Sequence, residues 1–511
     1  MSKRGRLNLG LVSLVVAVVG ASGLSACGSD GSDGNQAGSA GESGEAGENT
    51  GGAHAGSAGK SFGGSGGSAH AGTGGTGEAG MNTAGESAGG DSAAGDSAGG
   101  AAGMGGEAGA SSPPWMVDVR LSALSPLPAL PPDPTNNYVD NAGAALLGQK
   151  LFFDKRYSGA LTVAGELGAV GDTGKVACST CHLGGAMSDG RTPFNVTLGT
   201  GLHTRNAPAL VNSSFYEWTN WGGRFAAQWE LPLAVAENPL TMNSTRLKLA
   251  HFIYDNYKLE YEAVFGALPE ALASTAADAA RFPAAGKPGS TAWDTDTAPA
   301  DKAAVNLIIV NYGKAIQAYM RKLVSRNAPF DQYVATGGGN LSESAIRGSL
   351  LFVGKAKCTL CHSGPFFTDN KFHNLGGLGV DAGRFNDGAA LKASALNIDG
   401  VFSDKTDTGR LAGLTNPMTD DTTRSAFRTA SLREVKDTAP YMHAGQLADL
   451  AAVVSFYNAG GGEVPSTAPT GTVKDPLLTP LGLSEGEQAD LVEFLKTLSG
   501  DPVPSTLLAP P

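Results

Sequence analysis

Apolar residues recur every three or four positions over five stretches of the chain, which is the spacing of an amphipathic helix. The last stretch opens with Ser484 and Glu487, a capping-box start. Alternation of apolar and polar residues, which marks half-buried strands, is scarce. We therefore expect a mainly α fold with long loops. The predicted helices cover residues 244–265, 301–324, 342–352, 447–457 and 484–498.

Two stretches interrupt this helical pattern. Residues 282–300 are rich in Pro, Gly, Thr and Ala and predict an exposed connection. Residues 334–340 contain three consecutive glycines and mark the expected boundary between two domains, 113–335 and 336–511. A chain of this length can give each domain its own core.

The N-terminus has the pattern of an export signal. Basic residues precede an apolar run over residues 9–24, too short to span a bilayer, and Cys27 follows. The ending Leu-Ser-Ala-Cys resembles a bacterial lipoprotein signal over residues 1–27, with Cys27 acylated. An ordinary signal peptide with an incidental cysteine is the alternative. We expect a lipid anchor as the only membrane attachment, in the cell envelope and facing the periplasm. Asp30 does not directly follow Cys27, which favours the outer membrane.

Residues 28–112 consist almost entirely of Gly, Ala, Ser, Glu and Asp. Such a segment has little to bury and predicts a disordered, acidic tether. It carries much of the net charge of −12, so the remaining chain is only mildly acidic. This balance argues against a nucleic-acid partner.

The sequence Cys-x-x-Cys-His occurs twice and uses four of the five cysteines. Two thiols at this spacing can add to both vinyl groups of one haem, and the adjacent His can ligate its iron. A zinc site built from the two Cys pairs would leave both histidines unexplained. Similar Leu- and Phe-containing segments precede the two motifs, so we infer an internal duplication and two covalent haems c. The motifs are Cys178-Ser179-Thr180-Cys181-His182 and Cys358-Thr359-Leu360-Cys361-His362.

Beyond the haem motifs, an ordered set of segments resembles the bacterial dihaem cytochrome c peroxidase superfamily, which includes MauG-like enzymes. The resemblance extends over nearly all of the chain after the tether and implies two cytochrome c-like haem domains. The matching segments are residues 147–154, 204–212, 221–224, 328–333, 372–376, 427–433 and 438–445.

This resemblance implies a periplasm-facing oxidoreductase. Hydrogen peroxide would be reduced at the N-terminal haem on His182, and the C-terminal haem on His362 would transfer electrons. A redox protein would be the partner, either a small cytochrome c, a cupredoxin or a protein substrate. The family's calcium site would use the Asn206 side chain and the carbonyls of Thr438 and Pro440.

The sixth ligand of the second haem departs from the peroxidases. They place a Met at a fixed interval after the Pro-Tyr-x-His segment, whereas the same interval from His443 reaches Tyr457. MauG-like enzymes have an iron-ligating Tyr at this position. A hard phenolate stabilises oxidised iron, while a thioether favours the ferrous state. The resemblance thus implies Tyr457 as ligand, with Met442 and His443 as competitors.

The first haem departs from the family as well. Many peroxidases have a His about seven residues before the Arg-Asn-x-Pro segment that caps the inactive iron, and Leu198 stands there. We expect a five-coordinate haem, open to peroxide without reductive activation. His203 is the alternative cap.

The family's distal Glu lies five residues after the Arg of a Trp-Asp-Gly-Arg segment. Counting from Arg224 reaches Trp229, with Glu230 next. Peroxide cleavage needs a base that moves a proton between the two oxygens. Glu230 fills this role after a local shift, or Glu237 does, or the distal pocket is altered.

Other aromatic and His residues near these segments have less specific roles. An aromatic residue normally relays electrons between the haems in this family. Trp218 and Trp221 are both available, and we take Trp221, beside Arg224, as part of the catalytic set. His373 is expected to make a structural hydrogen bond.

Three functions compete. The first is a MauG-like peroxide-dependent oxidase, which Tyr457 favours. The second is an ordinary cytochrome c peroxidase fed by a small electron-donor protein. The third is a non-catalytic dihaem electron carrier, which predicts two six-coordinate haems and no reaction with peroxide.

Overall fold

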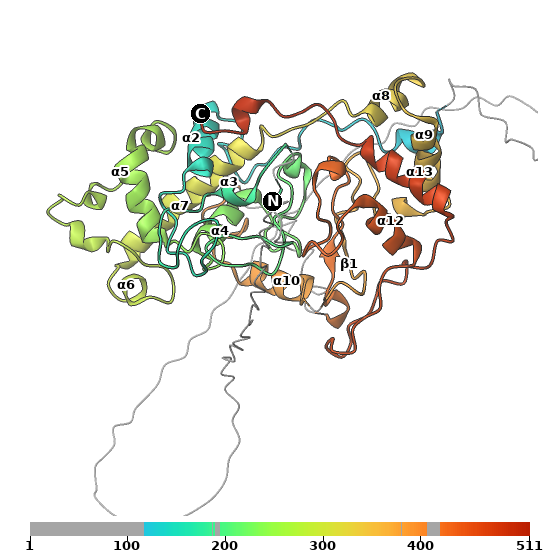
Figure 1. Ribbon diagram of the computed structural model, residues 1–511. Helices are drawn as coiled ribbons and strands as arrows, with labels where there is room; N and C mark the ends of the chain where they lie inside the picture. Colours follow the sequence, from blue (N-terminus) through green and yellow to red (C-terminus); the bar gives the residue numbers. More distant parts are fainter. Residues whose placement is uncertain (1–116, 186–187, 190–194, 380, 406–419) are drawn as a thin grey trace, which may run out of the picture. The chain divides into compact units, whose positions relative to one another are not determined.

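The computed structural model describes residues 117–185, 188–189, 195–379, 381–405 and 420–511 (Figure 1). The predicted signal, Cys27 and the predicted tether lie outside the described residues. Within the described part of the chain, we find no helix that combines the length and the apolar character needed to cross a bilayer.

The expected mainly α fold is confirmed. The only strands found among the described residues are β1 (Phe372–His373) and β2 (Phe427–Arg428), which pair antiparallel. The α-helices are α1 (Val119–Ser122), α2 (Ala142–Phe153), α3 (Cys178–Cys181), α4 (Leu231–Glu237), α5 (Arg246–Phe265), α6 (Thr291–Asp294), α7 (Pro299–Met320), α8 (Pro329–Thr336), α9 (Glu343–Val353), α10 (Arg384–Ala393), α12 (Leu450–Asn458) and α13 (Glu485–Lys496).

The five predicted helices correspond to α5, α7, α9, α12 and α13. The Ser484 capping box of α13 is present in both directions. Helix α12 begins three residues later than predicted, because Asp449 accepts a hydrogen bond from the Ala452 N–H at 2.8 Å and caps the helix there. The residue predicted as its start, Leu447, instead pairs with Tyr441.

The predicted connection over residues 282–300 is mostly exposed, as expected, but two of its aromatic residues are buried. Phe282 and Trp293 are only 3% and 5% exposed, and both belong to a hydrophobic core. Ser290 caps the short helix α6, and the guanidinium of Arg246 lies 4.9 Å from the Trp293 ring centroid. Pro and Gly correctly indicated an irregular backbone here, but the two aromatic side chains anchor it to the core.

The similar segments before the two haem motifs form helices α2 and α9. Helix α2 packs against α7, and α9 packs against α13 (Figure 1). Each crossing is so close that a Cβ atom on the glycine would clash: at Gly148 it would lie 1.9 Å from the Ala315 carbonyl oxygen, and at Gly348 2.0 Å from that of Asp490. Each half therefore has a close helix–helix crossing at a glycine of the helix before its haem motif, as expected after a duplication.

Two separate hydrophobic cores lie beside the two motifs. The first core is built by α2, α5 and α7, and Cys178 packs against it; the second is built by α9, α12 and α13, and Cys358 packs against it. The first and the last described segments each belong to the core of the other half. Leu121 near the N-terminal side belongs to the second core, whereas Val503 near the C-terminus belongs to the first.

In a third apolar cluster, the segment 391–404 of the C-terminal half packs against the N-terminal half near Trp229. Leu391 and Ile398 pack there with Trp229. Lys314 on α7 is only 2% exposed, and its Nζ lies 2.6 Å from Asp404 Oδ1. A buried ammonium needs such a partner, so this ion pair anchors the segment.

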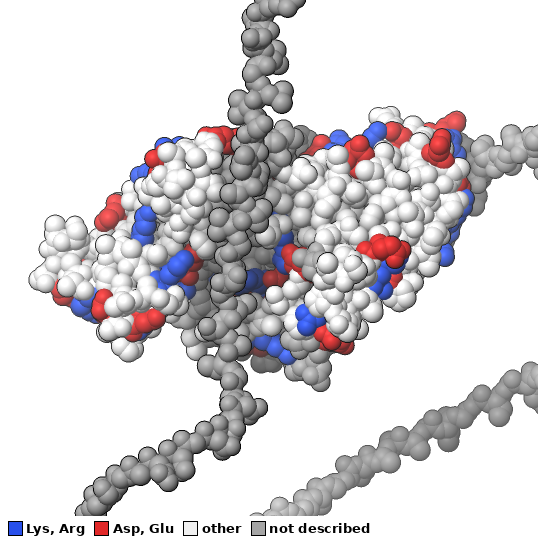
Figure 2. Space-filling model, turned by 60° about the horizontal axis from the view of Figure 1, so that its bottom comes forward, with Lys and Arg blue, Asp and Glu red and all other residues white. Residues whose placement is uncertain are grey.

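On the surface seen in Figure 2, basic and acidic side chains of the described residues are interspersed, and most of the area between them carries neither. The charge on this face therefore gives no preference for a partner of one strong charge.

Candidate functional site

The second haem motif is held in a geometry that suits an iron ligand. Cys358 opens a short 3₁₀ helix, and the His362 N–H donates to the Cys358 carbonyl at 2.8 Å. The His362 Nδ1 lies 3.0 Å from the Phe367 carbonyl oxygen. A His that donates from Nδ1 leaves Nε2 for a metal. Burial lowers the pKa of His362, which keeps the ring neutral as ligation requires.

A cavity of about 280 Å³ adjoins this motif. Its wall includes both cysteines, His362 and Tyr457, and most of the exposed wall is apolar. A covalent haem c needs two thiols, a proximal His and a largely apolar pocket, and these residues meet that requirement. Further apolar residues of the wall are Phe352, Val453, Val454, Leu481, Leu491 and Leu495.

Tyr457 faces this cavity from α12. Burial raises the pKa of its hydroxyl, and the nearby sulfurs of Cys361 and Cys358 raise it further. The phenol therefore lies in apolar surroundings beside the haem-attachment cysteines.

The two competing ligands also line the cavity. The His443 ring stacks on Phe427 with centroids 3.8 Å apart, and its Nε2 lies 3.4 Å from the Gln446 amide nitrogen. Burial lowers the pKa of His443 to about 4. Met442 adopts a left-handed backbone with φ of 72°. His443 thus already has stacking and polar contacts of its own.

The residues implied for calcium come together at the edge of the same cavity. The Asn206 Nδ2 lies 3.5 Å from the Pro440 carbonyl oxygen, and Thr438 lines the wall beside them. The Asn206 N–H donates to the His443 carbonyl at 2.7 Å, which fixes the two segments to each other. Calcium prefers oxygen ligands, so binding requires the Asn206 amide to turn its oxygen towards Pro440.

Trp221 connects the two halves at this point. Its Nε1–H donates to the Asn206 carbonyl at 2.7 Å, and its own carbonyl accepts from the Arg428 N–H at 2.8 Å. Its ring lines the cavity of the second motif. Trp218 instead lies in the third apolar cluster, where the Arg384 guanidinium is 5.3 Å from its ring centroid.

The first haem motif forms the short helix α3. Burial raises the pKa of the Cys178 thiol to about 11, against the opposite effect of the Tyr157 and Tyr312 hydroxyls. The His182 and Phe152 ring centroids are 6.2 Å apart. The Cys181 sulfur lies 3.7 Å from the carbonyl of the buried residue Leu198. Leu198 therefore lies beside the first haem motif.

One of the two ring nitrogens of His203 already has a hydrogen-bond partner. Its Nδ1 accepts a hydrogen bond from the Arg205 N–H at 3.0 Å. Burial and the Arg205 charge lower the pKa of His203. Only its other nitrogen could therefore cap an iron.

The proposed distal residues differ in their surroundings. Glu230 is 6% exposed, and its Oε1 accepts from the Ala227 N–H at 3.1 Å. Glu237 accepts two hydrogen bonds from the Arg246 guanidinium, at 2.9 and 2.8 Å. Arg224 is exposed, with its guanidinium 5.8 Å from the Phe225 ring centroid. The ion pair makes Glu237 the weaker candidate base and leaves Glu230 favoured.

Sequence analysis missed two polar clusters at the haem motifs. One is the Tyr157–Tyr312 pair. In the sequence, Tyr312 is only one of the apolar positions of a predicted helix, and nothing marks it as a neighbour of Tyr157. The other surrounds His373, whose Nδ1 lies 2.5 Å from Asp475 and whose Nε2 lies 3.1 Å from Asp369. Burial alone would lower the pKa of His373, but hydrogen bonds with Cys361 and both carboxylates raise it to about 10. His373 thus has the structural role that was expected.

Comparisons with known proteins agree with this site. A family model described as di-haem cytochrome c peroxidase matches residues 142–338. Cytochrome-c peroxidase IdrP1 of Denitromonas iodatirespirans is 34% identical over 399 residues, which cover 75% of this chain and 88% of the relative. Methylamine utilization protein MauG of Methylorubrum extorquens is 31% identical over 370 residues, which cover 71% of this chain and 79% of the relative.

A solved structure shares the fold. The diheme peroxidase BthA from Burkholderia thailandensis has a TM-score of 0.51 and 20% sequence identity, with 73% of this chain and 87% of that chain covered. The two sequence relatives cover more than two thirds of the chain. The chain therefore belongs to the di-haem cytochrome c peroxidase family of oxidoreductases, whose cofactor is haem c.

Proposed function

We propose that the chain is a periplasm-facing, MauG-like peroxidase with a Tyr-ligated second haem. The observation that carries this proposal is Tyr457, which faces the cavity of the second motif with His362 and both cysteines. A phenolate ligand would favour an iron that holds oxidising equivalents over one that supplies electrons. A reducing protein or small molecule would then be oxidised at the surface.

Each motif would hold one haem in this proposal. Cys178, Cys181 and His182 would hold the first haem, and Cys358, Cys361, His362 and Tyr457 would hold the second. When bound, the two haems supply the electron transfer that reduces hydrogen peroxide to water.

The protein's own residues would move protons and electrons around the haems. Glu230 would carry a proton between the two peroxide oxygens, because its buried carboxylate lies on the segment that follows Arg224. Arg224 would contribute positive charge to that side of the haem. Trp221 would relay electrons between the haems, because it contacts both the Asn206 segment and the second cavity.

We also propose a calcium ion at Asn206. The Asn206→Ala substitution is expected to weaken calcium binding by at least roughly tenfold, because a side-chain oxygen ligand is lost. Calcium titration of the holoprotein, followed by tryptophan fluorescence because Trp221 contacts Asn206, measures this effect.

The matched control is Thr438→Val. The proposed ligand there is a backbone carbonyl, so this substitution should leave calcium affinity nearly unchanged. Equal affinity for wild type and Asn206→Ala, or no calcium binding by wild type, would rule out the site.

The proposed location is the cell envelope, with a lipid on Cys27 and the outer membrane preferred. The support is the sequence pattern of residues 1–27. Membranes prepared from cells that express the full chain should contain the wild type, whereas Cys27→Ser should be released. Retention of Cys27→Ser on membranes would contradict the anchor.

Rapid mixing with peroxide tests the function directly. The fully oxidised protein should consume one equivalent of peroxide without prior reduction, because Leu198 stands where other peroxidases have a capping His. Consumption only after half-reduction would indicate an ordinary cytochrome c peroxidase. Failure to consume peroxide in either state would indicate an electron carrier.

A further inference from the structure

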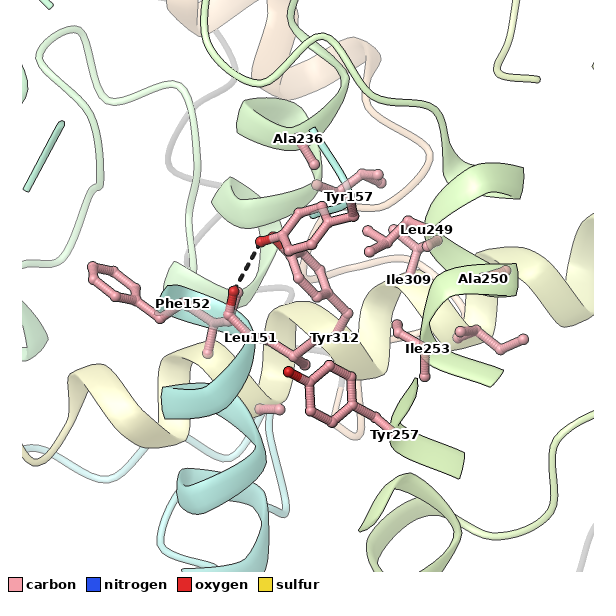
Figure 3. Close-up of a cluster of buried hydrophobic side chains, with 14 of the residues drawn as sticks. Leu151, Phe152, Tyr157, Ala236, Leu249, Ala250, Ile253, Tyr257, Ile309 and Tyr312 are labelled. Atoms are coloured by element: carbon pink, nitrogen blue, oxygen red, sulfur yellow. Dashed lines mark hydrogen bonds between the residues drawn. The ribbon is translucent and has the colours of Figure 1, made fainter. Parts of the chain in front are cut away.

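A pair of buried tyrosines, Tyr157 and Tyr312, lies in the first hydrophobic core (Figure 3). The hydroxyls of Tyr157 and Tyr312 are 3.0 Å apart, and the two side chains are at most 1% exposed. The Tyr157 hydroxyl also donates to the Leu151 carbonyl at 3.0 Å. Cys178, whose sulfur would become a haem thioether, packs against the core that contains both tyrosines. A series of neighbouring aromatic side chains therefore starts next to the cysteine that would attach the first haem.

From this pair, aromatic contacts continue to a third tyrosine. The Tyr157 ring centroid is 5.3 Å from that of Phe252, which is 5.8 Å from that of Tyr257. Tyr257 lies at a kink of α5, with φ of −137° and ψ of 18°, and is 9% exposed. Its hydroxyl donates to Asp154 Oδ2 at 2.7 Å.

The three tyrosines differ in what can accept their protons. Oxidation of a phenol by one electron makes it strongly acidic, so the electron leaves easily only where a base takes the proton. Tyr157 and Tyr312 face each other and a carbonyl oxygen, which is a very weak base. Tyr257 faces a carboxylate, and Asp154 is kept ionised because hydrogen bonds from Arg156 lower its pKa against the effect of burial. Of these three tyrosines, Tyr257 alone has a hydrogen bond to a carboxylate among the described residues.

We infer that Tyr257, hydrogen-bonded to Asp154, is a one-electron oxidation site through which oxidising equivalents leave the first haem when no external reductant is present. This inference rests on the proposed function. Reduction of one hydrogen peroxide to two waters takes two electrons and two protons. Tyr257 supplies one electron through Phe252 and the tyrosine pair, and its proton passes to Asp154. The haem held by His362 and Tyr457 would supply the other electron and would itself be oxidised by one electron, and solvent would supply the two protons.

Electron paramagnetic resonance of the full-length holoprotein tests this inference. After one equivalent of peroxide without reductant, we expect an organic radical signal that narrows when the tyrosine rings are deuterated. The Tyr257→Phe variant keeps the ring and its packing but has no hydroxyl, so the signal should be lost.

Tyr254→Phe is the matched control. Tyr254 lies on the same helix and donates to the Glu270 carboxylate at 2.6 Å, but the described aromatic contacts do not connect its ring to the path from Cys178. This variant should retain the signal. A signal that persists in Tyr257→Phe, or peroxide consumption without any tyrosine signal in wild type, would overturn the inference and leave the proposed function standing. If wild type does not consume peroxide, both fail.

Discussion

A Cys178→Ala, Cys181→Ala variant is expected to lose peroxide reduction down to the background rate. These cysteines attach the haem that we assign to peroxide, and the chemistry belongs to the cofactor. The Cys178 side chain packs against the first core, while the second core and its motif are built from other helices. The second haem should therefore still be incorporated. Haem content by absorbance and peroxide consumption by stopped flow measure the two effects.

The matched variant removes the other haem through Cys358→Ala and Cys361→Ala. It should still react with peroxide in a single event, because the first haem remains, but steady turnover should be lost. A reversed result, in which the second variant alone fails to react with peroxide, would mean that the roles of the two haems are exchanged.

Tyr457→Met is expected to raise the reduction potential of the second haem by on the order of several hundred millivolts, within the ~0.8 V range that axial ligands set. A phenolate stabilises ferric iron, whereas a thioether favours ferrous iron. A redox titration followed in the Soret band measures the change. Tyr457→Phe, with no ligating atom, should instead give a high-spin second haem.

Tyr441→Phe provides the control for this experiment. Tyr441 lines the same cavity, but its hydroxyl donates to the Val435 carbonyl at 3.0 Å. Its removal should leave the potential and spin state of the second haem unchanged. If Tyr457→Phe has no effect while a His443 or Met442 substitution changes the spectrum, the ligand is one of those residues.

The sequence predicted α5, α9, α12 and α13, which keep exposed faces, and it also predicted α7, although residues 308–320 of that helix are buried. It missed α2, which is apolar on most sides and packs closely on α7, so no polar face marks it. The buried anchors Phe282 and Trp293 were also missed, since two aromatic residues within a Pro- and Gly-rich stretch give no periodic signal.

The haem-attachment residues could be predicted because their chemistry demands a fixed local spacing. Long-range neighbours could not be predicted in this way. The approach of Asn206 to Pro440 was expected only through the family resemblance, and the place of Tyr312 in the core beside Cys178 depends on how α7 packs against α2. No local sequence pattern indicates that Leu121 packs in the second core and Val503 in the first.

Tyr457 ligation is tested most directly by electron paramagnetic resonance and near-infrared absorption of the ferric protein, before and after one equivalent of peroxide. If Tyr457 is the ligand, we expect one high-spin and one low-spin haem at rest, and a new near-infrared band after peroxide. Two low-spin haems that do not respond to peroxide until the protein is half-reduced would contradict it.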